Sequence, residues 1–139
     1  MEPLKLDYTV DGENFISAGE ASSNVKTVLK KLGFPADVIR RVAISMYEAE
    51  INMVIHAHGG KAHVEIGDDQ IVITLSDRGP GIENIELAMK EGYSTAPDDV
   101  RSLGFGAGMG LPNIKKYSDD LQIESSVGVG TTVKITVCC

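Results

Sequence analysis

Apolar residues recur at helical spacing along the first half of the chain. Between positions 18 and 32 they repeat every three or four residues, which predicts a helix that ends at Gly33 and Pro35. The following stretch, about 36 to 57, is mostly apolar and predicts a second helix that is buried. Because its apolar side chains occupy most of the helix circumference, only a narrow face is left for polar groups.

Shorter segments have the composition and alternation of strands. The segments 62–67 and 70–77 flank Asp68-Asp69 and predict a hairpin. Further strands are predicted at 6–10, 121–126 and 131–137, and further helices at 84–92 and from position 111. Helices early and hairpin strands late predict a single α+β domain over 1–139. We expect a two-layer sandwich whose mixed, mostly antiparallel sheet is covered by helices on one face.

The buried helix carries one narrow polar stripe. At about 100° per residue the stripe is roughly 80° wide, and its members are Arg41, Ser45, Glu48, Asn52 and His56. A stripe this narrow is typical of the floor of a cleft. A thin solvent-facing side of the helix explains it equally well. Glu50 lies nearly opposite Glu48, and we expect it to reach the edge of the helix or to form a salt bridge.

The turn after the predicted strand 70–77 brings a carboxylate next to glycines. Asp77 is followed by Gly79 and Gly81, which flank Pro80 and allow a tight turn with close approach of a ligand to the backbone. An Asp fixed at a strand end can accept a hydrogen bond from an exocyclic amine, as on adenine. Taken alone, the pattern is more often a plain turn, because these residues dominate turns.

Region 93–110 shows no periodicity and predicts a mobile loop, which ends in glycines at 104, 106, 108 and 110 just before a predicted helix. The pattern is neither the dinucleotide-binding motif nor a Walker P-loop. A glycine segment that leads into a helix N-terminus nevertheless presents N–H groups to an anion. Four glycines in seven residues, placed just ahead of Pro112, favour phosphate binding here over a disordered surface loop.

Charge and hydropathy exclude several classes of protein. Asp and Glu number 20 against 13 Lys and Arg, a net charge of −7, which argues against a broad nucleic-acid or membrane surface. No apolar run approaches a membrane span and the first residues lack the apolar core of a secretory signal, so we expect a cytoplasmic protein. Cys138 and Cys139 are adjacent and are expected to be free thiols.

The three polar motifs occur in a specific order: E-x-x-x-N on a helix, D-x-G-x-G after a strand, and G-x-G before a helix. This order resembles the N, G1 and G2 boxes of the GHKL ATPase/kinase superfamily. The runs YEAEINMVIHAHGG, GMGLPNIKKYSDDLQIES and GVGTTVKITV look most like the bacterial anti-sigma-factor serine kinases. The resemblance extends from about residue 6 to 137 and includes a nucleotide lid at about 93–110.

The resemblance implies ATP or ADP and Mg²⁺ as ligands and assigns roles by position. Glu48 matches the catalytic base and Asn52 the magnesium-coordinating Asn. Asp77 and Thr131 match the residues that bind adenine. The remaining matches are the glycines of the two glycine boxes and an arginine in the lid: Gly79, Gly81, Gly108, Gly110 and Arg101. The extra length of LGFGA in the lid makes the alignment of the arginine loose.

The resemblance also implies an activity and partners. It predicts a serine/threonine kinase that phosphorylates a small STAS-type antagonist protein, and a sigma factor as a second partner. One alternative is a module that sequesters a partner in a nucleotide-dependent manner, with slow or absent phosphorylation. A detached histidine-kinase catalytic domain is the third option, which the run from Glu48 to Asn52 disfavours. Relatives of this type often form homodimers, but no residue pattern indicates a dimer surface.

Overall fold

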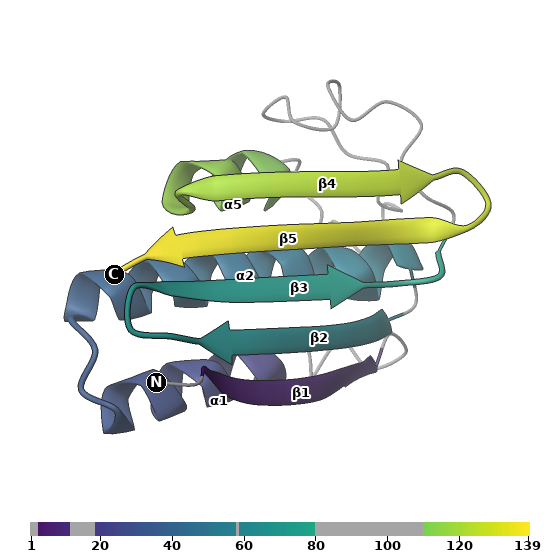
Figure 1. Cartoon of the computed structure of the whole chain (residues 1–139). Helices are drawn as coiled ribbons and strands as arrows, with labels where there is room; N and C mark the ends of the chain where they lie inside the picture. The colour runs from purple at the N-terminus through teal and green to yellow at the C-terminus, as the bar shows by residue number, and fades with distance from the viewer. Residues whose placement is uncertain (1–2, 12–18, 58, 80–109) are drawn as a thin grey trace, which may run out of the picture.

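The computed structural model describes residues 3–11, 19–57, 59–79 and 110–139 (Figure 1). Within these ranges the chain forms strands and helices in the following order: β1 (Leu4–Asp11), α1 (Glu20–Lys31), α2 (Ala36–Ala57), β2 (Gly59–Ile66), β3 (Gln70–Ser76), α5 (Gly110–Tyr117), β4 (Asp120–Ser126) and β5 (Gly130–Cys138). The predicted helix at 84–92 and nearly all of the predicted loop at 93–110 lie outside the described residues.

The described strands form one five-stranded sheet in the order β1-β2-β3-β5-β4. All four neighbouring pairs are antiparallel. The α+β class is therefore confirmed, but the sheet of the described residues is antiparallel throughout rather than mixed. Strand β2 begins at Gly59, earlier than predicted, because Gly59 and Gly60 pair with the end of β1 instead of closing the preceding helix.

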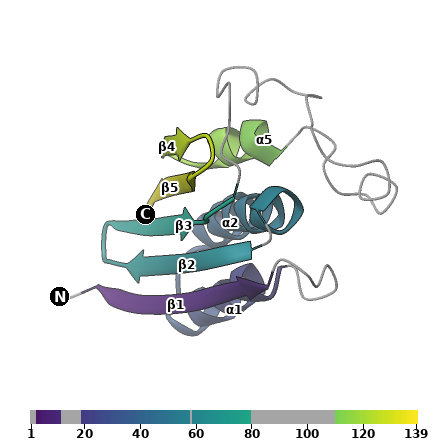
Figure 2. The ribbon, with the colours of Figure 1, turned by 90° about the vertical axis from the view of Figure 1, so that its right-hand side faces the viewer.

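The three described helices lie on the same face of the sheet, as Figures 1 and 2 show from two directions. Alternate residues of β2, β3 and β5 point toward these helices and are buried, as the alternation of a sheet with one covered face requires. Val42 and Met46 of α2 are fully buried between the sheet and the other helices. Burial of such a side chain contributes roughly 1.5–3 kcal/mol, so α2 is the centre of the core.

The end of α1 is set by Gly33, as predicted. Gly33 has φ +82°, its N–H donates to the Lys30 carbonyl (3.1 Å), and the Phe34 N–H donates to the Leu29 carbonyl (3.2 Å). This pair of bonds is a Schellman motif, which satisfies carbonyls that the helix end would leave without partners. Leu29 is fully buried, so the motif fixes α1 against the core at the turn into α2.

The start of α1 is held by Glu50 of α2, for which the sequence predicts a position at a helix edge or in a salt bridge. Only 2% of Glu50 is exposed. Its carboxylate accepts hydrogen bonds from the N–H groups of Gly19 (2.8 Å), Ala21 (3.3 Å) and Ser22 (3.0 Å). The expectation was wrong because the partner is the N-terminus of another helix, whose free N–H groups and dipole favour an anion.

Candidate functional site

The first half of the polar stripe on α2 is used to hold the fold together. Ser45 is fully buried and its hydroxyl donates to the Arg41 carbonyl (2.6 Å). The Arg41 guanidinium pairs with Asp37 (3.1 Å) and Asp119 (2.7 Å) and donates to the Cys138 carbonyl (2.9 Å). This end of the stripe therefore does not line a cleft, because its side chains bond to the helix itself, to the residue before β4 and to the end of β5.

The second half of the stripe carries the two residues predicted to act on the nucleotide. Glu48 and Asn52 are half-buried, one turn apart on α2. Burial raises the pKa of the Glu48 carboxyl, and a hydrogen bond from Asn113 opposes that rise. The donor is the Asn113 amide nitrogen, 3.4 Å from Oε1. The side chain of His56, the last member of the stripe, lies outside the described residues.

Asn113 was not singled out from the sequence. It directly follows Pro112 at the start of a helix, where a polar residue is ordinarily part of the helix-start signal. The sequence feature that could have indicated Asn113 is its position, three residues after Gly110, the last glycine of the segment 104–110. Only the contact of α5 with α2 turns that position toward Glu48.

Asp77 lies just beyond the end of β3 and is oriented by main-chain groups. Its Oδ1 accepts hydrogen bonds from the Gly79 N–H (2.9 Å) and the Thr131 N–H (3.1 Å), and its own N–H donates to the Thr131 carbonyl (2.9 Å). These bonds engage Oδ1 and fix the direction of the carboxylate, and no hydrogen bond from the described part of the chain uses Oδ2. The Thr131 hydroxyl lies 2.9 Å from the hydroxyl of Ser125.

Two glycines let neighbouring strands approach the backbone of Asp77. A side chain at Gly130 of β5 would collide with the Asp77 carbonyl oxygen, and Gly130 has φ +149°. A Cβ at Gly60 of β2 would collide with the Ser76 carbonyl oxygen and lie 3.1 Å from the Asp77 Cα and 3.0 Å from Cε of Met53. Because Met53 follows Asn52 on α2, this half of the helix packs at the end of β3 where Asp77 begins.

The structure thus brings predicted residues together in two clusters. Glu48, one turn before Asn52 on α2, is bonded to the first turn of α5, and Asp77 is bonded to Gly79 and Thr131. Gly110 is the first residue of α5, so the predicted phosphate-binding segment leads into the helix that contacts Glu48. Gly81, Arg101 and Gly108 lie outside the described residues, and their assigned roles stay predictions.

The donor set suits a magnesium ion that is held mainly by a nucleotide. Within the described ranges, no group of three or more His, Cys, Asp and Glu residues could hold a metal ion by itself. Mg²⁺ keeps several waters and is commonly bound by one or two protein oxygens together with substrate phosphates. The Asn52 side-chain oxygen, half-buried and one turn after Glu48 on α2, fits that role.

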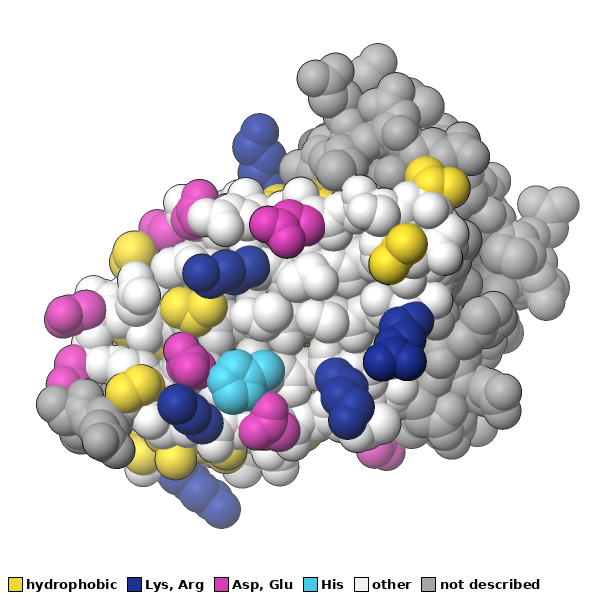
Figure 3. Space-filling view, turned by 45° about the vertical axis from the view of Figure 1, so that its right-hand side comes forward, with side chains coloured by type: hydrophobic (Ala, Val, Ile, Leu, Met, Phe, Trp, Pro, Cys, Tyr) yellow, Lys and Arg dark blue, Asp and Glu magenta, His cyan; other side chains and the backbone are white. Residues whose placement is uncertain are grey.

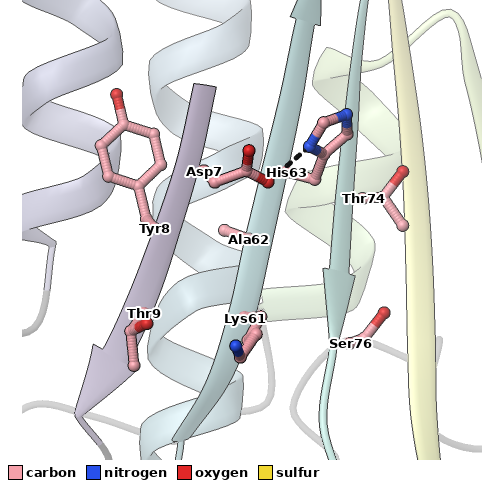
Figure 4. A pocket seen from close by; sticks show the side chains of 8 residues that line it. All are labelled: Asp7, Tyr8, Thr9, Lys61, Ala62, His63, Thr74 and Ser76. Carbon is pink, nitrogen blue, oxygen red and sulfur yellow. Dashed lines mark hydrogen bonds and ion pairs between the residues drawn. The ribbon is translucent and has the colours of Figure 1, made fainter. Parts of the chain in front are cut away.

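A separate hollow of about 270 Å³ lies on the open face of the sheet, opposite the helices (Figure 4). Its polar lining includes Asp7, Lys61, His63 and Ser76, and the His63 Nδ1 lies 2.6 Å from Asp7 Oδ1. Figure 3 shows acidic, basic and histidine side chains interspersed on one side of the molecule. Lining of mixed charge does not define a ligand class, and the sheet separates the hollow from Glu48 and Asn52.

Comparison with known proteins identifies the family. The family model of the histidine kinase-like ATPase domain matches residues 16–137. The chain belongs to this family. The match spans all three polar motifs, from the helix with Glu48 and Asn52 to the strand with Thr131, and it confirms the resemblance to GHKL-type ATP-binding domains.

Among curated relatives of this histidine kinase-like domain, several anti-sigma F factors align over nearly their full length. The anti-sigma F factor of Clostridium beijerinckii is 32% identical over 138 residues, which cover 95% of this chain and 91% of the relative. That of Clostridium acetobutylicum is 33% identical over 135 residues, 94% and 89% of the two chains. That of Thermoanaerobacter sp. is 31% identical over 141 residues, 94% and 95%.

A solved structure shares the fold of this histidine kinase-like domain. The crystal structure of the RsbU and RsbW domains of a Mycobacterium tuberculosis protein superposes with a TM-score of 0.65 at 17% identity. The superposition covers 96% of this chain and 32% of that one. The likeness confirms the predicted two-layer α/β architecture. Within the part of the chain that the structure describes, no helix is long and apolar enough to cross a membrane.

Proposed function

We propose that the protein binds ATP with Mg²⁺ and transfers the γ-phosphate to a serine or threonine of a small STAS-type antagonist protein, and that it thereby regulates a sigma factor in the cytoplasm. The observation that carries the proposal is the half-buried Glu48 carboxylate, one turn before Asn52 and beside the helix that the glycine segment enters. Membership of the ATPase family and the anti-sigma F relatives support it.

The proposed roles follow the geometry of the two clusters. Glu48 accepts the proton of the attacking hydroxyl, whose oxygen bonds to the γ-phosphorus as ADP leaves. Its raised pKa brings its basicity closer to neutral pH, which suits a general base. Asn52 holds Mg²⁺, which neutralises phosphate charge when bound. Oδ2 of Asp77, which no hydrogen bond from the described residues engages, accepts from the adenine amine, with Thr131 beside it.

The remaining roles concern the phosphates and the lid. We propose that the backbone of the second glycine box contacts the phosphates, that the first glycine box allows close approach of the base, and that the lid arginine reaches the γ-phosphate; these residues are Gly108, Gly110, Gly79, Gly81 and Arg101. Helix α5 begins at Gly110, where N–H groups without intrahelical partners favour an anion.

Replacement of Glu48 tests the proposal. We expect Glu48→Gln to bind ADP and Mg-ATP in calorimetric titrations with wild-type affinity and to lose at least a hundredfold in phosphotransfer, which is within the range for general-base removal. The assay uses radiolabelled ATP and a purified STAS-type antagonist of an anti-sigma F factor. Glu124→Gln, an exposed carboxylate on β4, is the matched control. Wild-type phosphotransfer by Glu48→Gln would remove Glu48 from the mechanism.

The names of the curated relatives favour a second candidate, nucleotide-dependent sequestration of a sigma factor with little or no kinase activity. Capture of a purified sigma F with ATP, with ADP and without nucleotide separates the two. A sequestering protein gives nucleotide-sensitive capture without any phosphorylated antagonist, whereas a kinase labels the antagonist. A homodimer stays a prediction that sedimentation of the same samples would test.

A further inference from the structure

The Glu48 carboxylate receives a side-chain hydrogen bond from a residue that no motif assignment includes. Asn113 lies in the first turn of α5 and its amide nitrogen is 3.4 Å from Glu48 Oε1. The next residue, Ile114, is fully buried in the core. Because Ile114 anchors this turn, the position of the Asn113 side chain is set by the packing of α5 against α2.

We propose that Asn113 is a positioning residue for Glu48, which holds the carboxylate toward α5 and makes its orientation depend on where the first turn of that helix lies. This inference rests on the proposed function, because Glu48 is a base only if the protein is a kinase. Asn113 touches neither the hydroxyl nor the phosphate in this scheme. It acts through Glu48.

Asn113 links Glu48 to the part of the chain where phosphate binding is predicted. Helix α5 starts at Gly110, where the predicted phosphate-binding glycines end, and Asn113 follows three residues later. Both residues lie in the same helix turn, so the packing that fixes the Asn113 amide also fixes where the helix begins. The orientation of Glu48 is therefore coupled to the helix turn that follows the predicted phosphate-binding glycines.

The electrostatics of Glu48 make the contact measurable. Burial and the Asn113 hydrogen bond are the two influences on its pKa, in opposite directions, and no charged side chain among the described residues contributes. An amide N–H stabilises the charged carboxylate. Removal of the amide should therefore raise the Glu48 pKa further, and the base should become protonated at a higher pH than in the wild type.

The test compares three variants of one position with a control. Asn113→Leu removes the donor at similar volume, Asn113→Ala does so if Leu perturbs packing, and Asn113→Asp places a second carboxylate against Glu48. Gln122→Leu is the control, because its amide nitrogen also donates to a carboxylate, Asp120 (3.2 Å), but on the open face of the sheet. The readouts are the ¹³C NMR titration of the Glu48 carboxyl, the pH profile of phosphotransfer and the affinity for ADP.

We expect Asn113→Leu to raise the titration midpoint of Glu48 by about half a unit or more, a threefold change in proton affinity, and to move the acid limb of the rate profile with it. Asn113→Asp should raise the midpoint further. ADP affinity and the Gln122→Leu profile should stay at wild-type values. An unchanged Glu48 midpoint in the folded Leu and Ala variants, or a shifted midpoint with an unshifted rate profile, would overturn the inference.

Failure of the proposed function gives a different result. If the wild-type protein transfers no phosphate at any pH, the kinase proposal fails, and with it the role of Asn113 in catalysis. The NMR titration still decides whether Asn113 acts on Glu48, because it needs no turnover.

Discussion

Replacing Glu50 with Gln should destabilise the protein although the two side chains have nearly the same shape. The Glu50 carboxylate joins α2 to the start of α1, with Oε2 accepting from Gly19 and Ala21 and Oε1 from Ser22. Gln keeps a single acceptor oxygen and presents an NH₂ group where the other oxygen stood. At least one of these main-chain N–H groups then loses its acceptor and points at the NH₂ group, which is itself a donor.

The magnitude follows from the bonds that are lost. An unpaired buried donor costs about 1–3 kcal/mol, and loss of a negative charge at a helix N-terminus costs about 0.3–1 kcal/mol, or up to about 2 in a buried setting. We therefore expect Glu50→Gln to lower the free energy of unfolding by about 2–4 kcal/mol. For a chain of this size that corresponds to a fall in Tm of roughly 6–15 °C.

Urea unfolding followed by circular dichroism measures the effect, and the m-value checks that unfolding stays two-state. Glu20→Gln is the matched control, because Glu20 is an exposed acid in the first turn of the same helix. It should lose only the helix-dipole contribution, below about 1 kcal/mol. A Glu50→Gln protein within about 0.5 kcal/mol of the wild type, the range of ordinary surface substitutions, would refute the reasoning.

Three further predictions concern charge and close packing. Asp7 raises the pKa of His63, so their pairing stabilises the fold below the ordinary imidazole pKa and is lost as pH rises through the raised value; His63→Asn should lower Tm slightly at pH 5.5 and not at pH 9. The main-chain N–H of Cys138 lowers the pKa of Asp119, and Arg41 lowers it further. The fall in Tm caused by Asp119→Asn should therefore be full at pH 7 and vanish as pH falls through that lowered pKa. Gly60→Ala should displace the backbone of Asp77 and weaken ADP binding about tenfold in calorimetry; wild-type affinity would contradict that placement.

Much of the fold could be predicted because local signals and tertiary packing agree. The apolar spacing of 36–57 and the glycine after 18–32 placed both helices within two residues of their observed bounds. The start of β2 was misplaced for a physical reason. Gly59 and Gly60 have poor strand propensity and indicate a break, but both pair with β1. Gly59 has φ +99°, and the close approach of β3 leaves no room for a side chain at Gly60.

Two glutamates of α2 show why the roles of site residues are harder to predict from the sequence than the fold. Glu48 and Glu50 are two residues apart, and the helix period alone places them on opposite sides. What distinguishes them is the partner. Glu50 is buried with its oxygens engaged by three main-chain donors, so it has little capacity to accept a proton from a substrate. Glu48 is half-buried, and within the described ranges it accepts a hydrogen bond from one amide, that of Asn113, which leaves more of its lone pairs for a hydroxyl than Glu50 has. A carboxylate serves as a base where the fold orients it without saturating it, and that distinction depends on α1 and α5 rather than on any pattern within α2.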